Sequence, residues 1–198
     1  IFTPRTLLAT LAEECRQQGV QLNLCYQDRQ DAEQALQKGE SDIGIYQAVN
    51  KSVSERFKWR AVGSIEMGVY SSPSLFAHRP VSQLSLAACN QLIPNKGLED
   101  HLARRLQIAD RVQFVNDAML LESLLGKGAG WAFLPAHVLD GRKRDIDRIE
   151  NETGNSGIVH TMVALWQQGQ AGHPSLKQVR DRLTAPPAAG VHYTATGW

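Results

Sequence analysis

The sequence of 198 residues lacks a long hydrophobic run and lacks an excess of charge of either sign. No apolar stretch reaches the roughly 20 residues that a membrane span needs, and there is no basic-then-apolar signal segment. Lysine and arginine number 21 against 20 acidic residues, so the surface offers no electrostatic footprint for nucleic acid or an anionic membrane. We therefore expect no membrane partner, and DNA contact only through polypeptide outside this chain.

Cysteine is scarce: Cys15, Cys25 and Cys89 are widely spaced and odd in number. This pattern fits neither a disulfide framework nor a zinc site, and it predicts reduced thiols in a cytoplasmic protein. No two of the six histidines have the short spacing that places metal ligands on one helix face. A Gly-x-Ser-x-Gly nucleophile elbow is also missing. The sequence predicts no metal, no cofactor and no enzyme activity.

What the sequence does contain is a succession of helical and strand patterns. At the start, Thr3 provides a capping hydroxyl and Pro4 suits the first helical position. Glycines placed just after a helical pattern act as stop signals, and alternation of apolar and polar residues predicts a strand. The elements predicted here are a helix ended by Gly19, a strand at 20–26, a helix capped by Asp28 or Asp31 and ended by Gly39, and a strand at 41–46.

The rest of the chain repeats this pattern after a long extended segment. Residues 59–71 have strand-like composition and exceed the average strand of about six residues, so they could serve two sheets in succession. The glycine cluster 126–130 ends a helix and precedes a strand. That is the wrong order for a phosphate loop, and it predicts a helix C-terminal cap. The remaining predicted elements are strands at 91–94, 112–115, 131–134 and 162–166, and helices around 98–106, 120–125 and 176–183.

Helices alternating with strands predict an α/β fold with mostly parallel sheets flanked by helices. Two such series joined by long extended segments predict two lobes with two crossover segments. Lobe I is expected to be discontinuous, with residues 1–66 and 161–185, and lobe II to comprise 67–160; residues 186–198, rich in Pro, Ala and Gly, are expected to form a loose tail. Because a helix capped at Thr3 normally follows a strand, the first strand is expected upstream of Ile1.

Polar residues at strand ends and helix starts are the candidate ligand contacts. In open α/β sheets, ligands bind outside the carboxyl ends of the strands, where each helix start offers N–H groups and a positive dipole end to an anion. Each residue could instead be a cap or turn residue, a role that Thr, Asn and Asp favour. Their recurrence at equivalent connections favours binding in a cleft between the lobes. The candidates are Thr3, Gln47, Asn95, Lys96, Asn116 and Asp117.

Three segments, taken in order, carry a family resemblance. They are the opening helix at 4–8 leading to the strand at 20–24, the Leu-x-x-Gly-x-x-Asp-Ile-Gly-Ile segment at 36–45, and the helix, glycine turn and Leu-Pro strand end at 115–135. From Thr3-Pro4 to about Leu183, the chain resembles the effector-binding (regulatory) domain of LysR-type transcriptional regulators. It departs from that family at Gly19-Val20, where the family usually has a proline before the second strand.

The resemblance implies a periplasmic-binding-protein-like fold and a small-molecule effector bound between the lobes. It also implies a homodimer or higher homo-oligomer, and an N-terminal winged helix-turn-helix, absent here, as the DNA-binding part. We expect a cytoplasmic effector-sensing domain of a bacterial regulator, with a small polar metabolite, expected to be anionic, as its ligand. Two alternatives stay open. A solute-binding protein of an uptake system shares the fold, and a two-lobed enzyme would need a clustered acid and base.

Overall fold

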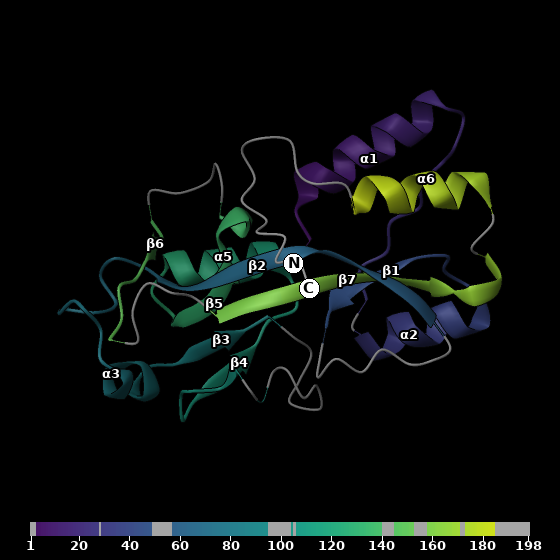
Figure 1. Ribbon diagram of the computed structural model, residues 1–198. Coiled ribbons are helices and arrows are strands. Elements are labelled where there is room, and N and C mark those ends of the chain that lie inside the picture. Colours follow the sequence, from purple (N-terminus) through teal and green to yellow (C-terminus); the bar gives the residue numbers. More distant parts are fainter. Residues whose placement is uncertain are drawn as a thin grey trace. The chain divides into compact units, whose positions relative to one another are not determined.

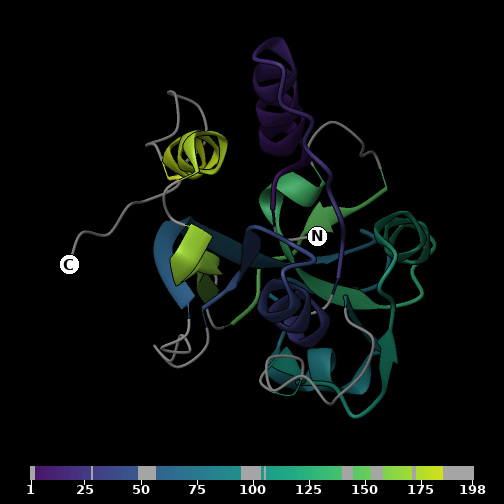
Figure 2. The ribbon, with the colours of Figure 1, turned by 90° about the vertical axis from the view of Figure 1, so that its right-hand side faces the viewer.

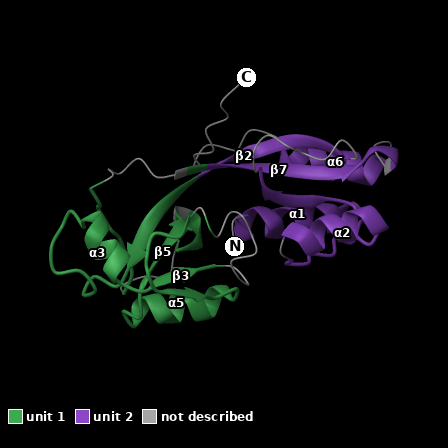
Figure 3. Ribbon diagram, turned by 90° about the horizontal axis from the view of Figure 1, so that it is seen from below, with its two compact units in different colours: residues 1, 66–159 green, residues 2–65, 160–198 purple. Residues whose placement is uncertain are grey.

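The computed structural model describes residues 3–27, 29–48, 57–94, 104, 106–139, 145–152, 158–170 and 173–184 (Figure 1). The chain divides into two compact units (Figure 3): unit 1 comprises residues 1 and 66–159, and unit 2 comprises residues 2–65 and 160–198. The chain passes between the units twice, once within strand β2 (Phe57–Ser71) and once within strand β7 (Ile158–Gln167). The two predicted crossover segments are thus confirmed, and β2 serves both units in succession.

Unit 2 is built on a ladder of strands with helices on both faces (Figures 1 and 2). Strand β1 pairs antiparallel with β7, from Gly44 opposite Leu165 to Gln47 opposite Met162, and β7 also neighbours β2. Two hydrogen bonds of 2.8 and 2.9 Å join the guanidinium of Arg182 to Glu14 and link the helices α1 and α6. The elements are α1 (Arg5–Gln17), α2 (Arg29–Lys38), β1 (Gly44–Gln47), the first part of β2, β7, the 3-10 turn η2 (Gln168–Gln170) and α6 (Pro174–Leu183).

The period of two along β1 and β7 divides the core of unit 2 between the two faces. On the α2 face, Tyr46, Val163 and Leu165 cluster with Leu36 and Phe57. On the α1 and α6 face, a second cluster joins the two helices, and partly buried residues of and near β1 pack against it. Its members are Leu11, Cys15, Val179 and Leu183, with Ile43 and Ile45 against them.

Unit 1 contains the second crossover series. Strand β3 pairs parallel with both β4 and β5, while β2 pairs antiparallel with β5 and with β6. The sheet is therefore mixed: parallel where β3 pairs with β4 and β5, and antiparallel where the long β2 enters. The elements are the second part of β2, α3 (Gln83–Ala88), β3 (Gln91–Ile93), β4 (Val112–Phe114), α5 (Ala118–Gly126), β5 (Trp131–Pro135), η1 (Ala136–Val138) and β6 (Asp147–Arg148).

The glycine cluster is a helix cap, as its position in the sequence predicts. Gly128 has φ of +71°; its N–H donates to the carbonyl of Leu125 at 2.9 Å, and the N–H of Ala129 donates to Leu124 at 3.0 Å. This pair of bonds is a Schellman motif, which satisfies carbonyls that the end of a helix leaves free. The same arrangement, with a glycine at positive φ, ends α1 at Gly19 and α2 at Gly39.

Two local predictions are wrong. Residues 20–26 are described without any strand assignment, and Leu24 and Tyr26 are 47% and 67% exposed. Alternation predicts an extended chain, but a strand also needs a hydrogen-bonded neighbour, and residues 20–26 belong to none of the strand pairings of the described residues. Thr3 does not cap α1 either, because Pro4 occupies the N-cap position and no side chain bonds there.

Several predicted features lie wholly or partly outside the described residues. These are Asp28, the tail at 186–198 and most of the predicted helix at 98–106. Of that helix, Leu106 is described and buried.

Candidate ligand-binding residues

The six candidate residues fall on different parts of the chain. Thr3 and Gln47 belong to unit 2, and Asn116 and Asp117 belong to unit 1. Asn95 and Lys96 lie outside the described residues. The structure defines the surroundings of the other four candidates. These four residues differ in burial and in hydrogen bonding, which the sequence does not reveal.

Gln47 is a buried carboxamide at the end of a strand. The residue is 9% exposed, and its Oε1 is buried with no hydrogen-bond partner in the described structure. Its cross-strand neighbour is Met162, whose thioether has no hydrogen to donate. Because Ile43 and Ile45 face α1 and α6, the period of two directs Gln47 to that same face. A buried acceptor without a donor costs about 1–3 kcal/mol, so a role other than stability is indicated.

The start of α1 is an uncapped helix terminus. Pro4 at the N-cap has no side-chain cap bond, and the first turn holds no acidic residue. Since the first N–H groups of any helix have no acceptor within it, this end presents donors and a positive dipole end. In Figure 1, α1 begins at the end of the ladder where β1 finishes. Unit 2 therefore combines unpaired donors at the start of α1 with an unpaired acceptor on Gln47.

The start of α5 in unit 1 is, by contrast, already capped. Asp117 is the N-cap residue, and its Oδ1 accepts the N–H of Leu120 at 2.7 Å. A carboxylate in this place stabilises the helix and occupies the positive end of its dipole. Asn116, next to it, is exposed. Asp117 thus has a structural role, whereas the Asn116 side chain reaches solvent beside the helix start.

A second buried polar group, on the α2 face, is not among the sequence candidates. The Tyr46 hydroxyl is buried without a hydrogen-bond partner in the described residues. Burial, and secondarily the charge of Glu33, raises the pKa of Tyr46 above its ordinary range. The Arg29 guanidinium lies 5.9 Å from the Tyr46 ring and bonds Glu33 at 2.8 Å. In the sequence, Tyr46 is simply one more member of an apolar strand, so nothing marks it.

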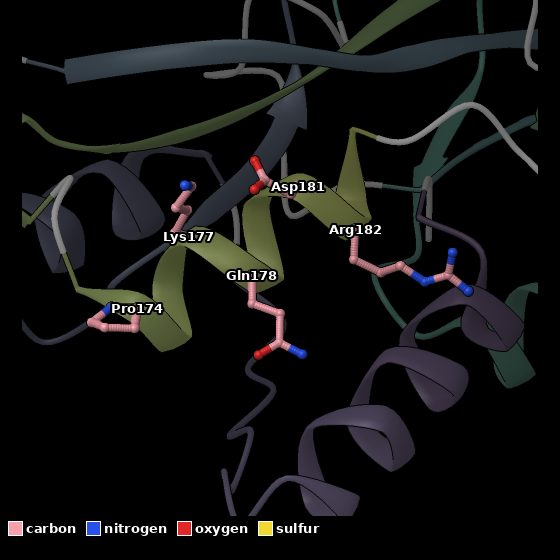
Figure 4. Close-up of a pocket in the computed structure, with 5 residues that line it drawn as sticks. All are labelled: Pro174, Lys177, Gln178, Asp181 and Arg182. Carbon is pink, nitrogen blue, oxygen red and sulfur yellow. The ribbon is translucent and has the colours of Figure 1, made fainter.

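A surface hollow of about 480 Å³ lies along α6 (Figure 4) and includes none of the candidates. Its lining residues all come from one helix, and Arg182 among them is already bonded to Glu14. The described residues contain no group of three or more His, Cys, Asp or Glu side chains able to hold a metal. No helix in the described ranges is long and apolar enough to cross a membrane. The lining residues are Pro174, Lys177, Gln178, Asp181 and Arg182.

The two α/β units joined by two strand crossings define a class, the periplasmic-binding-protein-like domains. The family model of the LysR substrate binding domain matches residues 3–186. The chain belongs to this family, which is one of transcriptional-regulator domains rather than of enzymes. A search of curated proteins finds no match.

Solved structures share the fold at low sequence identity. The regulatory domain of Synechocystis CcmR in complex with 2-PG is 14% identical, with a TM-score of 0.73 over 91% of this chain and 90% of that one. The BenM effector-binding domain with benzoate is 11% identical, with a TM-score of 0.67 over 92% and 88%. Vibrio fischeri DarR in complex with DNA is 17% identical, with a TM-score of 0.65 over 89% and 64%. The chain therefore spans less than two thirds of DarR.

Proposed function

We propose that this chain is the effector-sensing domain of a bacterial LysR-type transcriptional regulator. Its ligand is a small polar, anionic metabolite, and binding is relayed to a DNA-binding domain outside this chain. Family membership supports the sensing role. Two relatives in the fold comparison are regulator domains described with 2-PG and with benzoate. No observation favours the solute-binding alternative.

The uncapped start of α1 is the main observation that supports an anionic ligand. It has no side-chain cap and no acid in its first turn, so its N–H groups and dipole are available to a carboxylate or phosphate. Thr3, half-buried just before it, adds a hydroxyl that can donate to the same anion. Gln47 and Asn116 complete the proposed contacts, with Asn95 and Lys96 as further members from the sequence. Asp117 acts mainly as the cap of α5.

The two units act as the lobes of the sensor, with boundaries close to residues 66 and 160. A ligand shifts an equilibrium between two conformations only by its differential affinity for them, typically about 1–3 kcal/mol. The domain works as a homodimer or higher homo-oligomer in the cytoplasm, has no catalytic activity, and contacts DNA through an N-terminal domain, as its family suggests. The position of the ligand between the lobes stays a prediction.

Binding measured on single-residue variants tests this proposal. A thermal-shift screen of small metabolites identifies a ligand, because a compound that binds only the native state stabilises it by RT ln(1 + [L]/Kd). Calorimetric titration with Thr3→Ala and Asn116→Ala should then show an affinity about tenfold lower, as expected for the loss of one hydrogen bond to a charged group. Thr10→Ala and Asn23→Ala, both at exposed positions, are the matched controls. Unchanged affinity in both site variants would contradict the proposed site.

A further inference from the structure

The unpaired oxygen of Gln47 constrains the ligand beyond the negative charge proposed above. The Oε1 atom is an acceptor, buried at the end of β1, and no N–H or O–H of the described structure reaches it. The start of α1, by contrast, offers only N–H donors, which bind an acceptor. A simple carboxylate would satisfy the helix start and leave Gln47 unpaired.

The surroundings of Gln47 explain why the chain itself does not pair this oxygen. Met162, directly opposite on β7, is 3% exposed and has no hydrogen to donate. Ile45, the preceding residue on the same face, packs against the cluster between α1 and α6. The cross-strand neighbour of Gln47 and the preceding residue on its face are therefore both apolar.

We infer that the ligand carries a hydrogen-bond donor beside its carboxylate, which makes it a hydroxy acid or an amino acid. The carboxylate binds the N–H groups at the start of α1, and the neighbouring hydroxyl or amino group donates to Oε1 of Gln47. This inference rests on the proposed function and narrows the ligand class. It also explains why a polar residue occupies a buried position where an apolar one would pack better.

Sets of acids that share one carbon skeleton test the donor directly. Three probes have three carbons: propanoate has no second polar group, pyruvate has an acceptor, and L-lactate has a donor, with L-alanine as the amino counterpart. Succinate, oxaloacetate, L-malate and L-aspartate form the four-carbon set. Within the set that binds, we expect the donor-bearing acids to bind at least about tenfold more tightly than the other two, since an unpaired buried acceptor is costly. Equal affinities, or a preference for the keto acid, would overturn the inference.

The variant Gln47→Met separates a ligand contact from a structural role. Methionine has a similar length and no strong acceptor, so it should remove the preference for donors, leaving all acids of a set within about twofold of one another. Without ligand, the same variant should unfold at a higher temperature, because an unpaired buried carboxamide is replaced by an apolar side chain. A lower unfolding temperature would show that Gln47 is structural and would overturn the inference.

The controls distinguish failure of this inference from failure of the proposed function. Gln113→Met, at an exposed position on β4, should change neither the unfolding temperature nor the order of affinities. Binding of carboxylates without donor preference would refute the donor while leaving the effector-sensing function in place. If no acid of either set binds at 10 mM, the anion site itself is refuted, and the inference falls with it.

Discussion

Replacing Gln91 should destabilise unit 1 more than any exposed glutamine can. Gln91 is 1% exposed, and its carboxamide bonds only to backbone: Nε2 donates to the carbonyl of Leu106 at 2.7 Å, and Oε1 accepts the N–H groups of Ile108 and Ala109 at 2.8 and 3.1 Å. One side chain therefore fixes the turn that leads from Leu106 towards β4. Gln91→Met keeps the volume and removes all three bonds.

The size of the effect follows from which of these backbone groups can reach water. Leu106 and Ala109 are buried, whereas Ile108 is 38% exposed, so its N–H can be rehydrated. Two buried groups left unpaired cost about 1–3 kcal/mol each, and we expect a loss of about 3 kcal/mol. For a chain of this length, that lowers the unfolding temperature by roughly 6–12 °C.

Urea denaturation followed by far-UV circular dichroism measures this difference. Gln113→Met is the matched control, because Gln113 lies on the neighbouring strand β4 at an exposed position and should change the free energy of unfolding by less than about 0.5 kcal/mol. If the Gln91 variant stays within that margin of the control, the three-bond interpretation is refuted.

Three further perturbations have definite expected outcomes. Gly130→Ala should lower the free energy of unfolding by about 2–4 kcal/mol, because a Cβ there would collide with the carbonyl oxygen of Asn90. The control Gly169→Ala, with open space around it, should leave the free energy of unfolding unchanged. Equal stabilities of the two variants in calorimetry would contradict the predicted collision. Asp117→Ala should cost about 1 kcal/mol through the lost cap of α5, measured by urea denaturation, where no loss would deny it a capping role. Tyr46→Phe should stabilise the protein by about 1 kcal/mol at pH 8, since the hydroxyl is buried without a partner. Because burial raises the pKa of Tyr46 above its ordinary value of 10, the wild type should also lose stability as the pH rises above 10, and a pH series showing the same loss in the variant would refute that cause.

The helix ends and the crossovers could be predicted from the sequence because their causes are local. Gly19, Gly39 and Gly128 end three helices at positive φ, and a glycine at such a position is a short-range signal. The length of β2, 15 residues, is likewise visible as one extended apolar pattern. Both features need only neighbouring residues to be interpreted.

The partner of a strand, by contrast, is a property of the tertiary structure. Residues 20–26 alternate like a strand, yet in the structure they carry no strand assignment, and Tyr26 is mostly exposed. The sequence also does not predict that β2 pairs antiparallel with β5, because alternation and length do not determine the relative direction of two strands. Pairing depends on which edge is available, and no residue encodes that by itself.

The sequence predicts the candidate residues from their positions, but it does not reveal the hydrogen bonds that their side chains make. The sequence placed Gln47 and Asp117 in equivalent roles beside strand ends and helix starts. In the structure, the Asp117 carboxylate is engaged as a cap, while the Gln47 oxygen is buried and unpaired. Which polar group already has a hydrogen-bond partner depends on side-chain geometry, and neither composition nor spacing determines that geometry.

Hydrogen exchange read by mass spectrometry, with and without a saturating ligand from the screen, tests the location of the binding site most directly. We expect the largest gain in protection in peptides covering residues 3–8 and 44–48, where the start of α1 and the end of β1 would close on the bound acid. Protection confined to the α6 surface at residues 174–182, with these two segments unchanged, would contradict the account.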